Sequence, residues 1–432
     1  MKKGILLLSL KKLFFLFLFI SFAKIGIATP HFLIQLNRIL GERLMADQFS
    51  PPVASRIYMY PNLGAYEAMQ QVPLWDFLKG IPPIRWPVKD EVNSDYTAAF
   101  CFIQLASKLI YSSDQFEKQC KPILDSLAEP LNPKTVEQSI KWANEIKDQF
   151  LSRASSDGYK QRLTFVRYSI SDRESDYKLT PPNFSDPVEP YWGTIQPLIL
   201  NSQLADTSLM PNKFNLAENT PFQREVKEVY QLSKINSDST LTIARHWDCN
   251  PIQMEISGHV MQFAYRMTPA QHWISLLCDI AENNKIPVKD LSALLAKVSV
   301  ACFEAFIDCW NIKYLRNSIR PVSVINAYID SDWRPAIETP AFPEYPSGHS
   351  LVSAASSIVL SDYFGSEFNY VDSTQLVFNL PSVKFANFRS AALQAGESRI
   401  LGGIHFRKAV LDGFQRGETI GKMVIEKWLK KP

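Results

Sequence analysis

The sequence predicts an all-α protein organised as a helical bundle. Apolar residues make up 46% of the 432 residues and charged residues 21%, which excludes a disordered chain and is typical of one that folds around a core. Only 16 residues are glycine, about 4% against the usual ~7%, and this disfavours sheets connected by glycine turns. Apolar side chains recur at i, i+3 and i+4 along most of the chain, as they do in amphipathic helices.

The apolar periodicity divides the chain into separate helical segments. The expected helices are 33–46, 52–70, 95–112, 134–153, 221–235, 251–268, 288–316, 348–364 and 404–430. One short β-hairpin is expected within about 368–390, around Tyr370-Val371 and Val383-Lys384-Phe385.

Composition further predicts how the chain is organised. Residues 29–156 form an N-terminal helical region, and residues 221–432 form a helical domain that carries the candidate chemistry. Residues 157–220 differ from both, because they are rich in Pro, Ser, Asn and Asp. We interpret them as a long irregular connection packed on the surface.

Residues 1–28 have the pattern of a secretory signal peptide. Lys11 and Lys12 precede an apolar run, and Gly26-Ile27-Ala28 places small residues where a signal peptidase cuts. The run is too short to span a bilayer, although Lys24 near the cut leaves an uncleaved anchor as the alternative. We therefore expect a secreted or periplasmic protein that is soluble once the signal is removed.

The formal net charge of +3 comes from this leader. The leader holds five lysines and no acidic residue, and without it 41 basic residues face 43 acidic ones. No basic stripe remains, so a nucleic-acid partner is not expected.

The six cysteines are an even number, and export permits disulfides. Cys101 and Cys120 are candidate partners across a turn between helices. Cys302 and Cys309 lie about 10 Å apart along one helix and cannot bridge each other. No C-x-x-C motif occurs, so a zinc or redox cysteine site is not expected.

The helix 288–316 carries two unusual cations near its end. Lys313 continues an apolar stripe, and Arg320 follows on the same face if the helix persists as far as Pro321. Two core-facing cations are costly to bury unless an anion meets them. The alternative is that Lys313 snorkels to solvent while Arg320 pairs with a carboxylate.

A second motif is Pro346-Ser347-Gly348-His349. Ser347 is a good N-cap, Gly348 lets a ligand approach the backbone, and the free N–H groups of a helix start favour an anion. His349 titrates near neutral pH and can exchange a proton there. The alternative is an ordinary capped helix with a surface histidine.

A third motif joins Arg399 to His405. Six residues separate them, and the pair Gly402-Gly403 permits a sharp turn between them. By itself this segment is equally consistent with a loop that holds a stray arginine and a core histidine.

Together the three motifs describe a cage for a tetrahedral oxyanion held in the bundle, with forked arginine donors, a lysine charge and backbone N–H groups. Their order, K-x6-R-P, then P-S-G-H, then S-R-x5-H, resembles the vanadium-dependent haloperoxidases and the related type 2 phosphatidic acid phosphatase superfamily. The stretches TPAFPEYPSGHS, IARHW and PPVASRIYMY are similar to the soluble bacterial haloperoxidase-like branch.

The resemblance implies a role for each matched residue. The oxygens of vanadate or phosphate would be held by Lys313, Arg320, Ser347, Gly348 and Arg399. His405 would be the axial vanadium ligand, or the nucleophile of a phosphatase, and His349 would be the acid–base residue. Lys313 would also act in catalysis. Candidates for the substrate pocket are Trp310, Phe342 and Ser350.

The function implied by the resemblance is oxidation of halide by hydrogen peroxide to hypohalous acid, with vanadate as a Lewis acid that polarises the peroxide. One alternative is a secreted acid phosphatase that hydrolyses phosphate monoesters through a phosphohistidine at the same site. Another is a non-catalytic oxyanion-binding protein, which the two histidines disfavour because passive capture needs donors rather than a base.

One position departs from the phosphatase pattern. Many phosphatase relatives place an Asp four residues after the histidine that corresponds to His405, and here that residue is Ala409. Asp412 lies on the same helical face but about 10 Å along the axis. An attacking histidine needs a carboxylate to fix its tautomer, whereas a vanadium ligand can manage with a backbone carbonyl. The departure therefore favours the peroxidase.

Overall fold

The computed structural model describes residues 31–70, 92–200, 209–235, 237–257 and 260–429. Over these residues the chain is predominantly helical, with irregular connections, 3₁₀ turns and two separate two-stranded hairpins, so the all-α prediction is confirmed. The predicted signal peptide lies outside the described residues.

The helices fall into an N-terminal and a C-terminal group. The N-terminal group is α1 (Phe32–Ala46), α2 (Pro51–Gln70), α3 (Ser94–Ser107), α4 (Ser113–Ala128) and α5 (Pro133–Ser156). The C-terminal group is α6 (Pro221–Lys234), α7 (Asp238–His246), α8 (Pro269–Asn284), α9 (Val288–Arg316), α10 (Pro321–Tyr328), α11 (Gly348–Phe364), α12 (Phe388–Leu401) and α13 (Arg407–Leu429). The 3₁₀ turns η2 (Gln161–Thr164) and η3 (Trp192–Thr194) lie between the groups, and η4 (Thr374–Phe378) follows β3.

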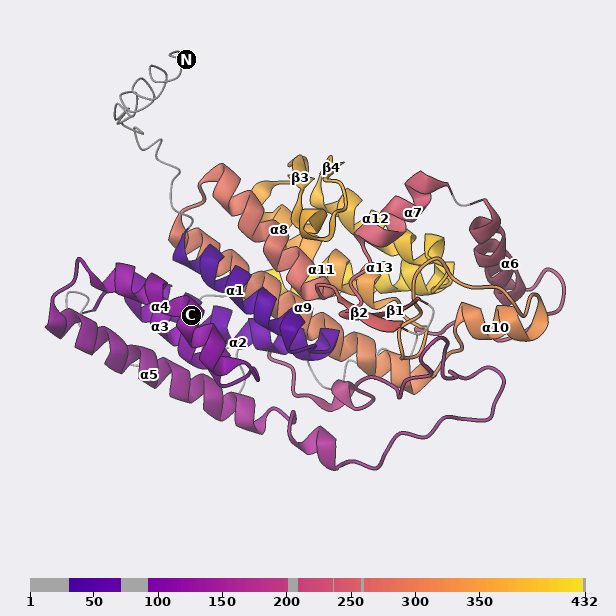
Figure 1. Cartoon of the computed structure of the whole chain (residues 1–432), viewed down its shortest axis with the longest axis horizontal. Coiled ribbons are helices and arrows are strands. Elements are labelled where there is room, and N and C mark those ends of the chain that lie inside the picture. Colours follow the sequence, from indigo (N-terminus) through magenta and orange to yellow (C-terminus); the bar gives the residue numbers. More distant parts are fainter. Residues whose placement is uncertain (1–30, 71–91, 201–208, 236, 258–259, 430–432) are drawn as a thin grey trace, which may run out of the picture.

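Helix α9 is the central element of the fold. It runs between the N-terminal helices and the pair α11 and α13, and it packs against α2 on one side and α11 on the other (Figure 1). Buried side chains occupy almost every position of α2 and most positions of α9. One apolar core therefore extends from α1 to α13 and joins the two groups of helices.

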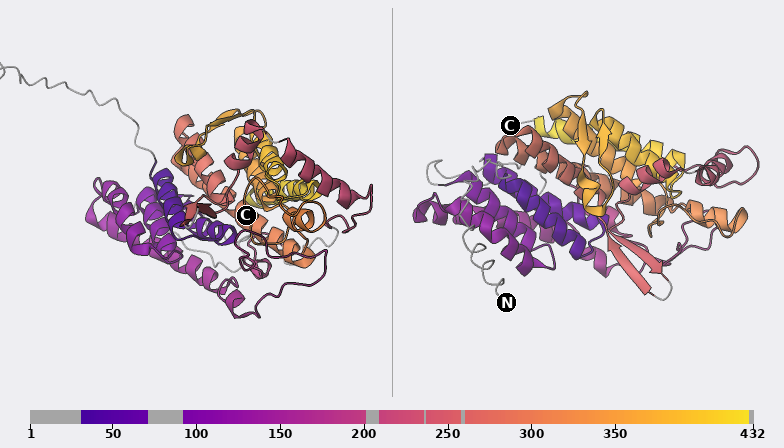
Figure 2. Two further views of the ribbon diagram at one scale, coloured as in Figure 1. Left: turned by 45° about the vertical axis from the view of Figure 1, so that its right-hand side comes forward. Right: turned by 45° about the horizontal axis from the view of Figure 1, so that its top comes forward.

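The helix predicted for 251–268 is wrong. This segment forms the strands β1 (Ile252–Ser257) and β2 (Val260–Tyr265), which pair in antiparallel register from Ile252↔Tyr265 to Ser257↔Val260. In the sequence, apolar residues of β1 alternate with polar ones, and this period of two indicates a strand. The hairpin stands out from the helices in the right-hand view of Figure 2.

The second hairpin lies where it was predicted. Strands β3 (Tyr370–Asp372) and β4 (Val383–Phe385) pair antiparallel. Several helices were not predicted, among them α12, whose buried positions include Gly396, Ser398 and Arg399. A helix that buries small and polar residues shows no apolar stripe to identify it.

Three glycines bring α13 into backbone contact with α11. They are Gly413, Gly417 and Gly421, and they face Ser347, Leu351 and Ala355 at the same spacing of four residues. A Cβ atom would lie 2.8 Å from the Ser347 carbonyl oxygen at position 413 and would collide with the Leu351 carbonyl oxygen at position 417. This close approach fixes the first turn of α11 beside the beginning of α13.

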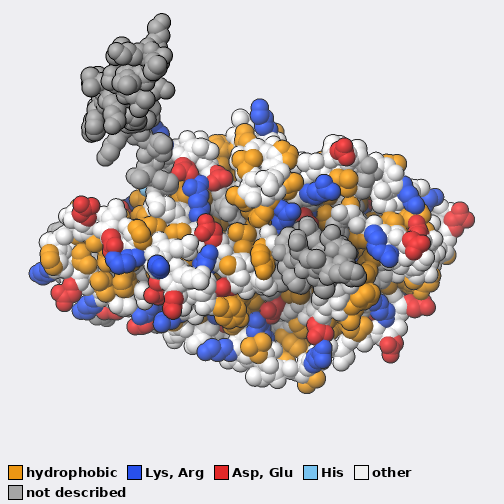
Figure 3. All heavy atoms as spheres, in the orientation of Figure 1, with side chains coloured by type: hydrophobic (Ala, Val, Ile, Leu, Met, Phe, Trp, Pro, Cys, Tyr) orange, Lys and Arg blue, Asp and Glu red, His pale blue; other side chains and the backbone are white. Residues whose placement is uncertain are grey.

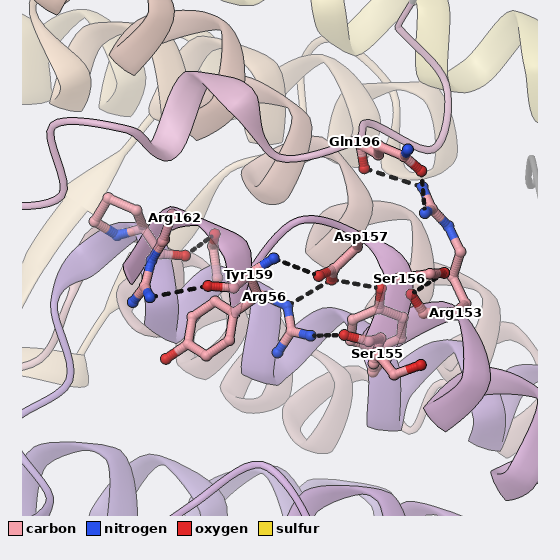
Figure 4. A network of polar contacts seen from close by, with 12 residues as sticks. Arg56, Arg153, Ser155, Ser156, Asp157, Tyr159, Arg162 and Gln196 are labelled. Atoms are coloured by element: carbon pink, nitrogen blue, oxygen red, sulfur yellow. Dashed lines mark hydrogen bonds and ion pairs between the residues drawn. The ribbon is translucent and has the colours of Figure 1, made fainter. Parts of the chain in front are cut away.

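The connection 157–220 is irregular, and most of its described residues are exposed or partly exposed, while a few are buried against the helices. Its first residue, Asp157, accepts a hydrogen bond on Oδ2 from Arg56 Nε at 2.7 Å (Figure 4). The same oxygen accepts from the Tyr60 hydroxyl at 2.9 Å. Arg153 donates to the Gln196 side-chain oxygen at 2.8 Å (Figure 4). These buried polar contacts hold both ends of the segment 157–196 against α2 and α5.

Further along the connection, a buried carboxylate of α9 binds its backbone. Glu304 accepts the amide N–H groups of Leu198 at 2.6 Å and Leu200 at 2.8 Å. Burial raises the pKa of Glu304 to about 7 despite these hydrogen bonds. The connection therefore follows a fixed course across α9.

The candidate pair Cys101 and Cys120 does not form a disulfide, since all six cysteines are free and buried. Cys101 Sγ packs on Gly64 of α2, 2.9 Å from where a Cβ atom would lie, so it faces α2 rather than α4.

Basic and acidic side chains are interspersed over the face shown in Figure 3. Among the described helices, none has both the length and the apolar character that crossing a membrane requires.

We predict that Gly417→Ala lowers the free energy of unfolding by about 1–3 kcal/mol, the usual cost of overpacking a well-packed contact, even though alanine favours a helix. The new methyl group must push α13 away from the α11 backbone. Denaturant unfolding measures the change. Gln415→Ala, on the exposed face of α13, is the matched control and should stay within about 0.5 kcal/mol of the parent protein. Equal stability of the two variants would contradict the close-contact argument.

Candidate active site

The three sequence motifs meet at one end of the bundle, where residues of the second and third motifs line one cavity. Lys313 lies in the last turn of α9, and Arg320 is the N-cap of α10. Ser347 is the N-cap of α11, which begins with Gly348 and His349. Arg399 lies in the last turn of α12, and His405 lies between α12 and α13. The cavity has a volume of about 590 Å³, and its wall includes Gly348, His349, Arg399 and His405.

Lys313 is fully buried and does not snorkel to solvent. Its Nζ atom donates to the backbone carbonyls of Pro343 and Glu344, both at 2.9 Å, and of Pro346 at 2.5 Å. Burial lowers its pKa to about 7, and the Arg320 charge acts in the same direction. Lys313 therefore shapes the loop before α11 and carries a charge that a nearby anion would stabilise.

Arg320 does not lie on α9 as the sequence suggested. Helix α9 ends at Arg316, because Asn317 adopts a left-handed conformation with φ of 48°, and Arg320 follows in extended backbone. Its guanidinium donates to the carbonyls of Phe342 at 2.9 Å and Ile404 at 2.8 Å. Burial lowers its pKa to about 10, and its Nη2 atom is buried without any partner.

The first turn of α11 offers backbone donors to the same site. Ser347 caps the helix by accepting the Ser350 N–H at 3.3 Å, as predicted. A Cβ atom at Gly348 would meet only ordinary contacts, 3.6 Å from the Trp310 ring and 3.8 Å from Cys309 Sγ. Packing within the protein therefore does not require glycine here, whereas the close approach of a ligand would.

Arg399 reaches the cavity from a helix rather than from a loop. Its side chain is 1% exposed, and this burial lowers its pKa. The guanidinium donates from Nε to the Ser398 hydroxyl at 2.9 Å and from Nη2 to the Ala244 carbonyl at 3.0 Å. Gly403 then takes φ of 79°, a left-handed conformation that favours glycine. This turn brings His405 back toward Arg399.

His405 is held in one tautomer by Glu344. Glu344 Oε1 lies 2.8 Å from His405 Nδ1 and also accepts the Phe406 N–H at 3.0 Å, so the imidazole proton is on Nδ1. The other ring nitrogen, Nε2, lies 3.2 Å from Arg320 Nη1, which can only donate. The lone pair of Nε2 therefore faces the cage, as a metal ligand or a nucleophile requires.

Glu344 corrects the inference that no carboxylate orients His405. The carboxylate comes from the loop before α11 instead of from position 409, and burial raises its pKa to about 8. Asp412 is occupied elsewhere, with Tyr345 and Lys408. The only feature of the sequence that could have identified Glu344 is its place as an acidic residue in the Pro- and aromatic-rich stretch just before Ser347.

His349 presents a free ring nitrogen to the cavity. Its ring is hydrogen-bonded to the backbone of Trp247, and its Nε2 atom is buried without a partner. Burial and the Arg399 charge lower its pKa well below the usual range. The imidazole is therefore neutral in the absence of an anion and can accept a proton.

The walls of the cavity are partly apolar and come from distant segments. The Trp310 and Phe342 rings lie 4.8 Å apart, and the Trp310 indole N–H donates to the Val188 carbonyl at 3.1 Å. Pro51 of α2 and Asn183 of the connection also line it, which the sequence did not reveal. Ser350, predicted for this pocket, is not part of the lining; its Oγ atom packs instead near Gly396.

A second cluster of side chains able to bind a metal lies beside the cage. His246, His272 and Asp372 are buried, and their ligand atoms lie within 4.8 Å of one another. Both Nε2 atoms hydrogen-bond to Asp372 Oδ2, at 3.0 and 2.7 Å. The carboxylate is thus already satisfied by the protein.

Comparison with known proteins places the chain in a family. The family model of the VCPO second helical-bundle domain matches residues 328–431. A solved bacterial vanadium-dependent iodoperoxidase has a TM-score of 0.84 and 34% identity, over 92% of this chain and 96% of that one. No curated protein sequence matches. The chain therefore belongs to the vanadium-dependent haloperoxidases, as the sequence motifs indicated.

Two further structures share the fold. The holo and apo forms of a bacterial vanadium-dependent chloroperoxidase each have a TM-score of 0.67, with 15% and 17% identity over 88% of this chain. The matched regions cover 92% of the holo chain and 93% of the apo chain.

We predict that the two histidines separate binding from turnover. His405→Ala removes the lone pair that faces the cage, so the affinity for vanadate should fall steeply. His349→Ala leaves the cage intact, so vanadate should still bind while turnover falls by about 10²–10⁴-fold. Lys313→Ala should weaken both. Isothermal titration with vanadate and a halide-oxidation assay measure the two effects, and the opposite pattern for the two histidines would reverse their assigned roles.

We predict that Glu344→Ala lowers vanadate affinity by about 10–100-fold, the usual cost of removing a partner that orients a metal ligand. Glu344→Gln should recover much of this loss, because its amide oxygen can still accept from His405 Nδ1 and the Phe406 N–H. Vanadate titration of both variants, with thermal melts to confirm folding, checks the prediction. Similar affinity in the parent protein and the alanine variant would show that Glu344 does not orient His405.

Proposed function

We propose that this protein oxidises halide with hydrogen peroxide to hypohalous acid, with vanadate as its resident cofactor. The observation that carries the proposal is the buried cage. Arg399, His405 and the start of α11 line one cavity. Of the two other buried cations, Arg320 contacts His405 Nε2 and Lys313 donates to the Pro346 carbonyl just before α11. The unpartnered Arg320 Nη2 and the open side of Gly348 fit an oxyanion in that space.

The residues of the cage divide the work between holding the anion and moving protons. Lys313, Arg320 and Arg399, with the N–H groups at the start of α11, would hold the vanadate oxygens, and His405 Nε2 would bind the metal. When bound, vanadate supplies a Lewis acid that polarises peroxide without changing its own oxidation state.

His349 is the residue placed to move a proton. Its Nε2 atom would accept a proton as peroxide enters and would return it to the departing oxygen. An anion in the cage would raise the pKa of Lys313 from its low value and restore the lysine charge. Trp310 and Phe342 would limit water around the halide on the apolar side of the cavity.

Iodide is the halide we propose. The support is the 34% identity to a bacterial iodoperoxidase over most of both chains, compared with 15–17% to the chloroperoxidase. Export is proposed as well, on the sequence of the leader alone, with a mature protein that begins near Thr29.

A secreted acid phosphatase is the second candidate, because one observation favours it. Glu344 supplies the carboxylate that an attacking histidine needs, and this removes the main argument against a phosphohistidine at His405. The two candidates share the cage and differ in the reaction that it supports.

We predict that metal-free protein has no halide-oxidising activity until vanadate is added, and that phosphate competes with vanadate during this reconstitution. The physical reason is one cage for two anions of the same shape and charge. The assay uses peroxide with iodide, bromide or chloride, and iodide should react fastest. Lys289→Ala, an exposed lysine on the same helix as Lys313, is the control and should behave like the parent protein. Rapid hydrolysis of a phosphate monoester with no effect of vanadate would establish the phosphatase instead.

A further inference from the structure

Three side chains form a linked row at the wall of the cavity, next to the cage but outside it. Cys249 Sγ lies 3.6 Å from His272 Nδ1, and His272 Nε2 lies 2.7 Å from Asp372 Oδ2. The residues come from the segment after α7, the first turn of α8 and the end of β3. A thiol, an imidazole and a carboxylate in this order are the arrangement that activates a cysteine nucleophile.

The hydrogen bonds fix the direction of proton transfer in this row. Asp372 Oδ2 accepts from His272 Nε2, so the lone pair of Nδ1 faces both the Cys249 thiol and the side-chain amide of Gln375, which lies 3.3 Å from it. Asp372 is itself held, because its Oδ1 atom accepts from the Thr374 N–H at 2.9 Å and hydroxyl at 2.6 Å. Burial opposes a charged imidazole, but Asp372 outweighs burial and raises the pKa of His272, so the imidazolium that forms when Nδ1 takes a proton is stabilised.

The position of the row supports a reaction in the cavity. Cys249 lines the same cavity as His349 and Arg399, so a small oxidant that enters for the main reaction meets it. The Trp247 ring stacks on the His272 imidazole at 4.5 Å and fixes its plane. A cationic surrounding and access to a cavity are the conditions under which protein thiols react.

We propose that Cys249 is a second reactive centre of this chain, a thiol that His272 and Asp372 activate for oxidation by hydrogen peroxide to a sulfenic acid. His272 Nδ1 takes the thiol proton, and the sulfur attacks one peroxide oxygen. An S–O bond forms and the O–O bond breaks. The sulfur loses two electrons to the departing hydroxide, which takes the proton from His272 and leaves as water.

This modification has a consequence for the main activity. The added oxygen occupies cavity space beside His349 and Arg399, so halide oxidation should decline as Cys249 is oxidised. Two equivalents of an added thiol reverse the change, because they reduce the sulfenic acid to the thiol with formation of their own disulfide and one water. The reaction takes its peroxide from the proposed function but needs no vanadate, so each can fail without the other.

The experiment exposes the metal-free mature protein to hydrogen peroxide in the presence of a 1,3-dione that traps sulfenic acids, and maps the labelled peptides by mass spectrometry. Cys278 is an internal control, since it lies on α8 with His272 and burial raises its pKa to about 12. Cys249 should be labelled at least ~10²-fold faster than Cys278, and His272→Gln should slow its labelling by about 10²-fold or more. In the vanadate-loaded enzyme, Cys249→Ser should retain a larger fraction of activity after exposure to excess peroxide.

Several results would overturn the proposal. The first is that Cys249 is labelled no faster than Cys278. This result needs only the parent protein, so it counts even if His272→Gln fails to fold. Equal labelling in parent and His272→Gln removes the role of the imidazole. One equivalent of zinc retained by the purified protein and lost in Asp372→Asn would assign the two histidines to a metal instead. Equal inactivation of parent and Cys249→Ser would show that the oxidised thiol does not affect the main site.

Discussion

The burial of three cations in one small volume is the constraint on which the rest of the site depends. Lys313, Arg320 and Arg399 are almost completely removed from solvent, and burial lowers the pKa of each. Charges of one sign are costly in such a place unless an anion compensates them. Of the buried carboxylates nearby, Glu344 is directed at His405, and Asp248 in the cavity wall acts on Arg399. The cage is thus preorganised for an anion that comes from outside.

The architecture holds this unfavourable arrangement in place from three directions. Lys313 and the loop before α11 are joined by three hydrogen bonds from a single ammonium group. The glycine contacts between α13 and α11 set the distance between the helix start and the turn that carries His405. The connection bound by Glu304 crosses α9 and brings Val188 to the indole of Trp310. Each support has backbone atoms on at least one side, which ties the course of the chain to the site.

The surroundings of the cage also separate two kinds of histidine. His349 and His405 have a strongly lowered pKa, because burial and neighbouring cations oppose a second proton. His272, a short distance away and equally buried, has a raised pKa because Asp372 compensates its charge. A neutral imidazole suits a metal ligand or a proton acceptor, whereas an imidazole paired with a carboxylate suits the activation of a neighbouring thiol. Burial is common to all three, so the partner of each ring decides its chemistry.

The sequence by itself determined the fold class and the residues of the cage. Helical spacing and good caps such as Ser347 act over a few neighbouring residues, and a lysine or arginine in a core-facing position is rare enough to identify an anion site. The spacing of apolar residues did not predict the β1–β2 hairpin, where the apolar residues of β1 recur every two positions. It also did not predict α12, which buries small and polar residues. Only the tertiary structure decided that Glu344 orients His405, that Cys101 and Cys120 stay apart, and that Cys249 meets His272 and Asp372. These pairings join or separate segments that are distant along the chain, and they depend on how the helices pack rather than on any spacing within one of them.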